Sequence, residues 1–399
     1  MLYAHMPYLV LFAWVQVTLS GFAVRAVVEG DLCPEAVIDG TAIPMSVRAR
    51  ASTLFPVTVC ELALPAGLLE LSIEEQRLPV PDAEKGDVAL IGDTGCRIWV
   101  PSKGGPDLQN CLDPKAWPFA AIAQNIAAAK PKLVVHVGDY VYRESPCPEE
   151  EAGCAKSPHG DNWETWRVDF FEPAKKLLAQ APWLFVRGNH ELCDRVGHGW
   201  FRLLDPGPYR ETCIDETEPY LFSNAGINWI VMDNVAVKDS DDPADPVSAQ
   251  KYRQQFQQVN QMVHERNWQQ AWLVMHEPVW GAKPTKERMR LFNPTLQSAF
   301  EAAPKEIQLV LSGHIHYFQV LNSQMIIGIS GTKLEKFTQE GSQILFSERP
   351  ELEFKTWVQF GHVMVREGSQ LDLYDLNNQV TQSFTLSGGR LHLLCDQKQ

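Results

Sequence analysis

Six side chains that could bind metal ions follow apolar runs of the chain, each of which reads as a buried strand. They are Asp93, Asp139, Asn189, His276, His314 and His316. Carboxylates, imidazoles and an amide oxygen suit borderline metals such as zinc, manganese and iron. The set exceeds what one tetrahedral zinc site takes, and it suits two ions that share a bridging carboxylate. Such a pair can hold a hydroxide as nucleophile and clamp the oxygens of a phosphoryl group.

The strands that would position these side chains alternate with helical segments. Apolar runs such as VALIG at 88–92 and LVVHVG at 133–138 predict buried strands, and amphipathic patterns predict helices at 115–130, 163–180 and 248–267, the second interrupted at Pro173. Alternation of this kind indicates an α/β fold, in which ligands lie beyond the carboxyl ends of the strands. After residue 325 strand follows strand, which favours a mixed sheet that closes a sandwich.

Five short motifs carry a resemblance to a known family. They are GDTG at 92–95, GDYVY at 138–142, GNHE at 188–191, LVMH at 273–276 and GHIH at 313–316. In this order, over roughly residues 87–316, they resemble the signature blocks of calcineurin-like metallophosphoesterases. The resemblance implies a four-layer αββα sandwich with a two-metal site at one edge. It also implies hydrolysis of a phosphoric ester by metal-activated water.

One departure from the general family pattern points to a branch of it. The family begins with Asp-x-His, whereas this chain has Asp93-Thr94-Gly95 and, three residues after Asp139, a tyrosine at Tyr142. This combination resembles the purple acid phosphatases, in which that tyrosine binds a ferric ion. Replacing a neutral imidazole with an anionic oxygen hardens the site toward Fe(III). A second departure, Leu273 where that branch has valine, leaves the ligand His276 intact.

The resemblance assigns the ligands to two metal ions, iron paired with iron, zinc or manganese. The first ion would take Asp93, Asp139, Tyr142 and His316, and the second would take Asp139, Asn189, His276 and His314. In this arrangement Asp139 bridges the two ions. His190 would lie just outside the metals, where it could bind the phosphoryl group and protonate the leaving oxygen. Glu191 is expected to orient His190 or a backbone group.

The predicted activity is hydrolysis of small phosphorylated substrates, most simply phosphomonoesters. A phosphodiesterase on the same scaffold and a metal-bearing binding module without catalysis are the alternatives. The formal net charge of −14 argues against general binding to nucleic acid or to an anionic membrane. An anionic substrate stays compatible with this charge, because bound metal ions reverse the field locally.

The N-terminal segment predicts an exported protein. Residues 1–26 contain a long apolar stretch and read as a signal peptide or, if uncleaved, as a membrane anchor; a buried helix is a third reading. Residues 27–81 predict a small β-rich module, residues 87–386 the catalytic domain, and residues 387–399 a C-terminal tail. Export would place the protein in the periplasm or outside the cell.

The nine cysteines fit an oxidising compartment. Eight of them fall in near neighbours, which suggests the disulfides Cys33–Cys60, Cys96–Cys111, Cys147–Cys154 and Cys193–Cys213, with Cys395 left over. Sequence alone does not fix this connectivity, and several free buried thiols are the alternative. No pair has the spacing of a cysteine zinc site.

Overall fold

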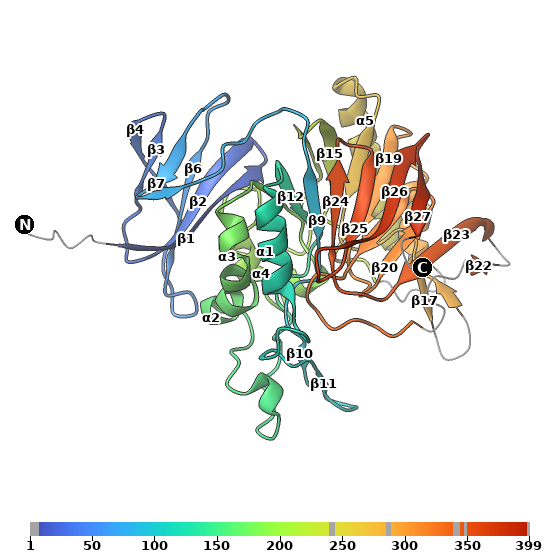
Figure 1. The fold of residues 1–399 in the computed structure, drawn as a ribbon, viewed down its shortest axis with the longest axis horizontal. Coiled ribbons are helices and arrows are strands. Elements are labelled where there is room, and N and C mark those ends of the chain that lie inside the picture. Colours follow the sequence, from blue (N-terminus) through green and yellow to red (C-terminus); the bar gives the residue numbers. More distant parts are fainter. Residues whose placement is uncertain (1–7, 239–243, 285–288, 338–343, 347–348, 397–399) are drawn as a thin grey trace, which may run out of the picture.

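The computed structural model describes residues 8–238, 244–284, 289–337, 344–346 and 349–396. Two large sheets face each other and are covered by helices on their outer faces (Figure 1). The helices are α1 (Phe119–Ala129), α2 (Trp163–Trp166), α3 (Glu172–Leu178), α4 (Gly197–Leu203), α5 (Pro246–Glu265) and α6 (Pro294–Phe300). Shorter turns are η1 (Ala152–Cys154), the π-helical η2 (Arg167–Phe171) and η3 (Asn189–Glu191).

The first large sheet has eleven strands. In order across the sheet they are β27 (Arg390–Asp396), β26 (Val380–Ser387), β25 (Gln370–Tyr374), β24 (His362–Arg366), β9 (Val88–Ile91), β12 (Leu133–His136), β13 (Trp183–Phe185), β1 (Leu9–Thr18), β2 (Gly21–Glu29), β6 (Thr58–Ala63) and β5 (Ser46–Ala49). The central strands β9, β12, β13 and β1 run parallel to one another. Their carboxyl ends therefore meet at one edge of the sandwich.

The second large sheet has eight strands. They are β14 (Tyr220–Asn224), β15 (Ile227–Val231), β16 (Ala271–Val274), β19 (Ile307–Ser312), β21 (Gln324–Ile327), β20 (Phe318–Leu321), β23 (Arg349–Trp357) and β22 (Ile344–Phe346). Strands β15, β16, β19 and β21 are parallel. Three small sheets complete the fold: β4 (Thr41–Pro44), β3 (Glu35–Ile38), β7 (Leu71–Ile73) and β8 (Gln76–Arg77); β10 (Ile98–Trp99) and β11 (Asp107–Leu108); β17 (Ala282–Pro284) and β18 (Met289–Leu291).

The core lies in three apolar layers that follow from the alternation of side chains along each strand. In β9, Ala89 and Ile91 face the helices α1, α3 and α4, whereas Val88 and Leu90 face the second sheet. On the far side, α5 and α6 pack against the outer face of that second sheet. The expected four-layer αββα sandwich is confirmed.

Strands β1 and β2 correct the reading of residues 1–26 as a signal peptide or anchor. They form a hairpin within the large sheet, where Gln16 of β1 pairs with Trp183 of β13. One face of the pair packs under the helices through Phe12 and Trp14, and the other packs against the small four-stranded sheet. A strand buried on both faces has a continuous apolar sequence, and this is why it resembles the core of a signal peptide.

The expected domain boundaries also change. The N-terminal region is β-rich as predicted, but β5 and β6 from the expected module at 27–81 belong to the large sheet that holds the catalytic strands. At the other end, residues 390–396 of the expected tail form β27, which pairs with β26. Among the described residues no helix is long and apolar enough to cross a membrane.

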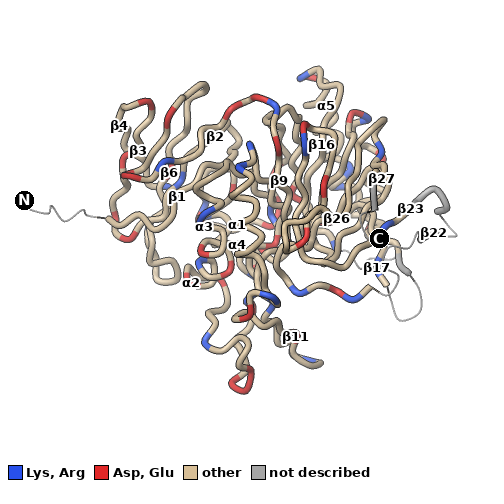
Figure 2. Tube along the Cα trace, in the orientation of Figure 1, with Lys and Arg blue, Asp and Glu red and all other residues tan. Residues whose placement is uncertain are grey.

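All four expected disulfides are present. Three of them begin shortly after an expected metal ligand, since Cys96 follows Asp93, Cys147 follows Tyr142 and Cys193 follows Asn189. Closing a loop in this way restricts the unfolded chain and fixes the turn beside it. Residues of both charge types are spread along the described trace (Figure 2).

Candidate active site

The turns that follow the parallel strands bring the expected ligands together. Asp93, Asp139 and His314 adopt positive backbone φ angles of 56°, 62° and 70°. Conformations of this kind cost non-glycine residues about 1–3 kcal/mol each and persist where the surroundings fix them. Here the turns hold one another: the amide of His314 donates to Asp93 Oδ1 at 3.0 Å, and the amide of His190 donates to Asp139 Oδ1 at 2.9 Å.

The first cluster of donors gathers around the hydroxyl of Tyr142. This hydroxyl lies 3.0 Å from Asp93 Oδ1, 2.6 Å from Asp139 Oδ2 and 2.9 Å from His316 Nε2. Burial, followed by the nearby charges of Asp139 and Asp93, raises the pKa of the phenol well above its usual value. All four residues assigned to the first metal ion therefore meet at one point.

Gly95 shows why the histidine of the general family is absent. A Cβ atom at this position would lie 2.7 Å from the backbone oxygen of Tyr140 and 2.7 Å from the backbone nitrogen of Tyr142. Any side chain would therefore collide with backbone that cannot move without shifting Tyr142. The tyrosine and the glycine are consequently linked features of this chain.

The second cluster gathers around the side-chain oxygen of Asn189. This oxygen lies 3.0 Å from His276 Nε2 and 3.0 Å from His314 Nδ1. Asp139 Oδ2 is 3.2 Å from His276 Nε2, so the same carboxylate that contacts Tyr142 also reaches this cluster. The second ring nitrogen of His276 contacts the carbonyl oxygen of Val137 at 2.8 Å, which fixes the orientation of the ring.

The donor set fits two metal ions. Asp93 and Asp139 are buried, and within the described residues neither forms an ion pair with a lysine or an arginine. Their ion-pair partners among the described residues are histidines alone, and bound metal ions would add the positive charge that buried carboxylates need. Asp139, His276 and His314 each offer a ligand atom, and these atoms lie within 4.8 Å of one another. With Tyr142 as a hard oxygen donor, the first cluster suits a trivalent ion better than the second.

Glu191 holds two of these turns together. Its carboxylate accepts hydrogen bonds from the amides of Gly188, Asp139 and Tyr140 at 2.9 to 3.1 Å. Burial and the charge of Asp139 raise the pKa of Glu191 to about 8, although the backbone donors act in the opposite direction. Glu191 therefore orients backbone groups, which is one of its two expected roles.

His190 lies beside the clusters and meets two residues that motif reasoning missed. Its Nδ1 is 2.5 Å from Glu144 Oε1, its Nε2 is 3.8 Å from Asp139 Oδ2, and Arg195 donates toward its ring at about 3 Å. Burial lowers the pKa of His190 to about 4. Burial alone would raise the pKa of Glu144, but His190 and Arg195 lower it to about 2. Glu144 lies two residues beyond the GDYVY motif, so no pattern marks it.

Other charged and polar residues next to the motifs have structural partners. Arg143 forms an ion pair with Asp169, and Arg187 donates to the carbonyl oxygens of Glu191 and Ile214 and pairs with Asp233. His136 contacts the hydroxyl of Thr94 at 2.9 Å beneath the first turn.

A cavity of about 490 Å³ opens over the clusters. Besides the expected ligands Asp139, Tyr142, Asn189, His314 and His316, it is lined by Arg97, Trp99, Glu144, His190, Arg195, Lys283 and Glu335. The charged residues of this lining come from separate segments that contain no recognisable motif. The sequence alone therefore did not predict them.

Comparisons with known proteins agree with this geometry. A sequence model of the family described as calcineurin-like phosphoesterase matches residues 87–318. No curated protein matches the chain. Purple acid phosphatase PPD1 from yellow lupin (Lupinus luteus) seeds has a similar structure, with a TM-score of 0.56 at 12% identity over 95% of this chain and 74% of that chain. The structure of PhoD is also similar, with a TM-score of 0.56 at 11% identity over 97% of this chain and 92% of that one.

Proposed function

Because the chain belongs to the calcineurin-like phosphoesterase family, we propose that it hydrolyses phosphomonoesters with water activated by two metal ions. The observation that carries the proposal is the position of Asp139. Its carboxylate reaches both the Tyr142 hydroxyl and the His276 imidazole, as a bridging ligand must. Bound ions would supply a hydroxide nucleophile and neutralise charge on the phosphoryl oxygens.

His190 is the proposed donor of the proton to the leaving oxygen. Glu144 contacts Nδ1 of the ring, whereas Nε2 lies 3.8 Å from Asp139 Oδ2 and 3.0 Å from Nη2 of Arg195. A hydrogen bond such as the one to Glu144 fixes the orientation of an imidazole. To donate from Nε2 the ring must carry a proton on both nitrogens. Burial opposes this form and lowers the pKa of His190 to about 4, whereas the charges of Asp139 and Glu144 favour it. Arg195 holds Glu144 in turn and adds a positive charge close to the place of the transferred phosphoryl group.

Iron is the proposed ion of the first cluster, paired with iron, zinc or manganese in the second. The support is the phenol of Tyr142 together with the crowding that excludes a histidine at Gly95. Iron-loaded protein should show a broad visible absorption band, and Tyr142→Phe should lack it. A colourless wild-type protein that hydrolyses phosphate esters with zinc or manganese would contradict the iron assignment and leave the hydrolase proposal standing.

Export is proposed from the four disulfides, since structural disulfides form and persist in oxidising compartments. The proposal rests on these bonds and not on the N-terminal segment, since β1 and β2 are parts of the fold.

The activity is tested by comparing turnover of p-nitrophenyl phosphate with that of bis-p-nitrophenyl phosphate after loading with each metal. We expect the monoester to have the higher kcat/KM and Asp139→Asn to lose both activities. Preference for the diester would replace the phosphomonoesterase proposal with the phosphodiesterase alternative. Uptake of two ions without hydrolysis of either compound would favour a binding module that lacks catalysis.

A further inference from the structure

Two side chains at the mouth of the cavity have no part in holding the metals. Trp99 of β10 lines the cavity and is 40% exposed, although it is a large aromatic residue. The guanidinium of Arg97 lies 5.4 Å from the centre of the Trp99 ring and 5.5 Å from the centre of the Tyr142 ring. The guanidinium of Arg97 therefore lies near both the exposed indole and a residue of the first cluster.

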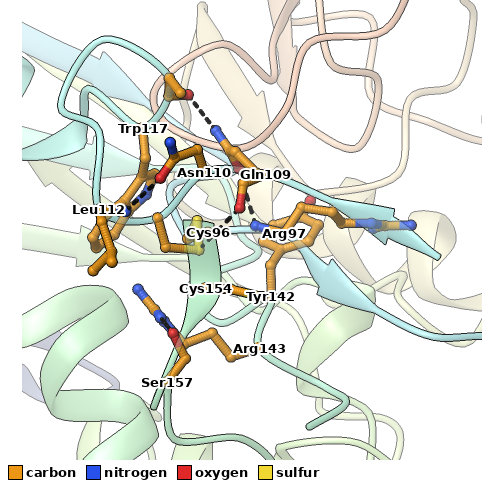
Figure 3. Close-up of a disulfide and its surroundings, with 12 residues drawn as sticks. Cys96, Arg97, Gln109, Asn110, Leu112, Trp117, Tyr142, Arg143, Cys154 and Ser157 are labelled. Atoms are coloured by element: carbon orange, nitrogen blue, oxygen red, sulfur yellow. Dashed lines mark hydrogen bonds between the residues drawn. A yellow bond between two sulfur atoms is a disulfide. The ribbon is translucent and has the colours of Figure 1, made fainter. Parts of the chain in front are cut away.

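The segment that carries these two residues, the β10–β11 arm (residues 96–111), is held firmly. The Cys96–Cys111 disulfide closes its base, and the amide of Arg97 donates to Gln109 Oε1 at 3.0 Å (Figure 3). The side-chain amide of Gln109 also donates to the carbonyl oxygen of Gly331 at 2.8 Å, which ties the arm to the rest of the molecule. A site that is rigid before binding loses less entropy when its ligand arrives.

The donors at the end of the Arg97 side chain suit an anion. Within the described residues the guanidinium of Arg97 donates a hydrogen bond only through Nε, to Asp107, and Asp107 also accepts from Lys333. Lys283 of the cavity wall pairs with Glu335. The terminal nitrogens of Arg97 thus keep donor capacity at the cavity, and a guanidinium presents such donors in a planar fork that matches carboxylates and phosphates.

We propose that Arg97 and Trp99 form the subsite for the leaving group, and that the preferred substrates are phosphomonoesters of a planar, aromatic leaving group that carries a second anionic group. The ring would stack on Trp99 and the second anion would bind Arg97, while the phosphate to be cleaved lies at the clusters. This inference rests on the proposed function and specifies the substrate class of the same site.

The test uses four substrates that separate ring from charge: phenyl phosphate, 4-carboxyphenyl phosphate, propyl phosphate and 4-carboxybutyl phosphate. For each substrate the ratio of variant to wild-type kcat/KM cancels its intrinsic reactivity. Trp99→Ala should lower kcat/KM about tenfold for the two aryl phosphates and leave the two alkyl phosphates within about twofold. Arg97→Gln should lower it about tenfold for the two carboxylate-bearing substrates alone.

Val100→Ala and Lys103→Gln are the matched controls, because both residues are exposed on the same arm and neither lines the cavity. Both control variants should give kcat/KM values close to those of wild type on all four substrates. Equal losses on all four substrates with Trp99→Ala or Arg97→Gln, or no loss on any, would overturn the subsite.

Binding of 4-carboxyphenylphosphonate, measured by calorimetry, separates this inference from the proposed function. Wild-type protein should bind it about tenfold more tightly than either variant does. Selective binding without turnover of any substrate would contradict the proposed hydrolysis and leave the subsite standing. Turnover of the substrates, together with equal binding of the phosphonate to wild type and to both variants, would contradict the subsite and leave the proposed hydrolysis standing.

Discussion

Two regions differ in the role of their residues: the turns that carry the expected metal ligands, and the N-terminal hairpin of β1 and β2. The turns place polar groups at the edge of the sandwich, where Asp93, Asp139 and His314 adopt unfavourable backbone angles. The hairpin β1–β2 contributes no side chain to the cavity walls, yet it is buried on both faces. Backbone strain and polar groups mark the first region, whereas apolar burial marks the second, so changes in the two should separate activity from stability.

Deleting residues 1–26 should have the largest effect, because it removes β1 and most of β2 from the middle of the large sheet. It would also remove Arg25, whose guanidinium donates to the carbonyl oxygens of Leu203 and Asp205 at the end of α4. We expect no soluble folded protein, as judged by circular dichroism and size-exclusion chromatography. A deleted protein that folds and binds metal would show that the hairpin is dispensable.

Arg25→Met tests the same region more gently. Loss of the buried guanidinium leaves the carbonyl oxygen of Leu203 without this donor, whereas Glu61 and the carbonyl oxygen of Asp205 keep Arg48 as a partner. The loss should cost about 1–3 kcal/mol of the free energy of unfolding. Urea denaturation measures this, with the exposed Arg77→Met as control. Below the unfolding transition the variant should keep wild-type kcat/KM.

Asp139→Asn should produce the opposite pattern. Removing the shared carboxylate should lower kcat/KM at least about 1,000-fold, which corresponds to about 4 kcal/mol of activation free energy. Stability of the metal-free protein should fall only slightly. Burial alone raises the pKa of Asp139, but His276 and His190 lower it well below its usual value, so the fold favours the charged form and its neutralisation costs some stability. Steady-state kinetics and urea denaturation on the same preparation measure both quantities. A large loss of stability would mean that Asp139 is needed chiefly for the fold.

His190→Gln should lower kcat about 100-fold for propyl phosphate, because an alkoxide needs a proton in order to leave. The loss should be much smaller for p-nitrophenyl phosphate, whose leaving group departs readily without one. An equal loss on both substrates would assign His190 to phosphate binding instead of proton donation.

Glu144→Gln should have the smallest effect, about tenfold on the same alkyl substrate, because it acts only through the orientation of His190. In the His190→Gln background the Glu144→Gln change should add almost nothing. Additive losses in this double-mutant cycle would mean that Glu144 acts independently of His190.

The same contrast explains what the sequence could predict. The expected ligands each lie two to four residues beyond the end of a strand, so a short window contains both the strand and the residue: Asp93, Asp139, Asn189, His276 and His314. The sequence does not reveal the hairpin, because an apolar run does not show whether protein or lipid surrounds it. The strand that β1 pairs with, β13, is also far away in the sequence. Arg97, Trp99 and Glu144 were missed for a related reason, since only the tertiary fold brings them to the cavity.

The most direct test of the central claim is a titration of the metal-free protein with iron and then zinc, with hydrolysis of p-nitrophenyl phosphate measured at each addition. The account predicts negligible activity without metal and a plateau at two ions per chain, with Asp139→Asn inactive throughout. A plateau at one ion, or hydrolysis that persists without metal, would contradict the proposal of two ions bridged by Asp139.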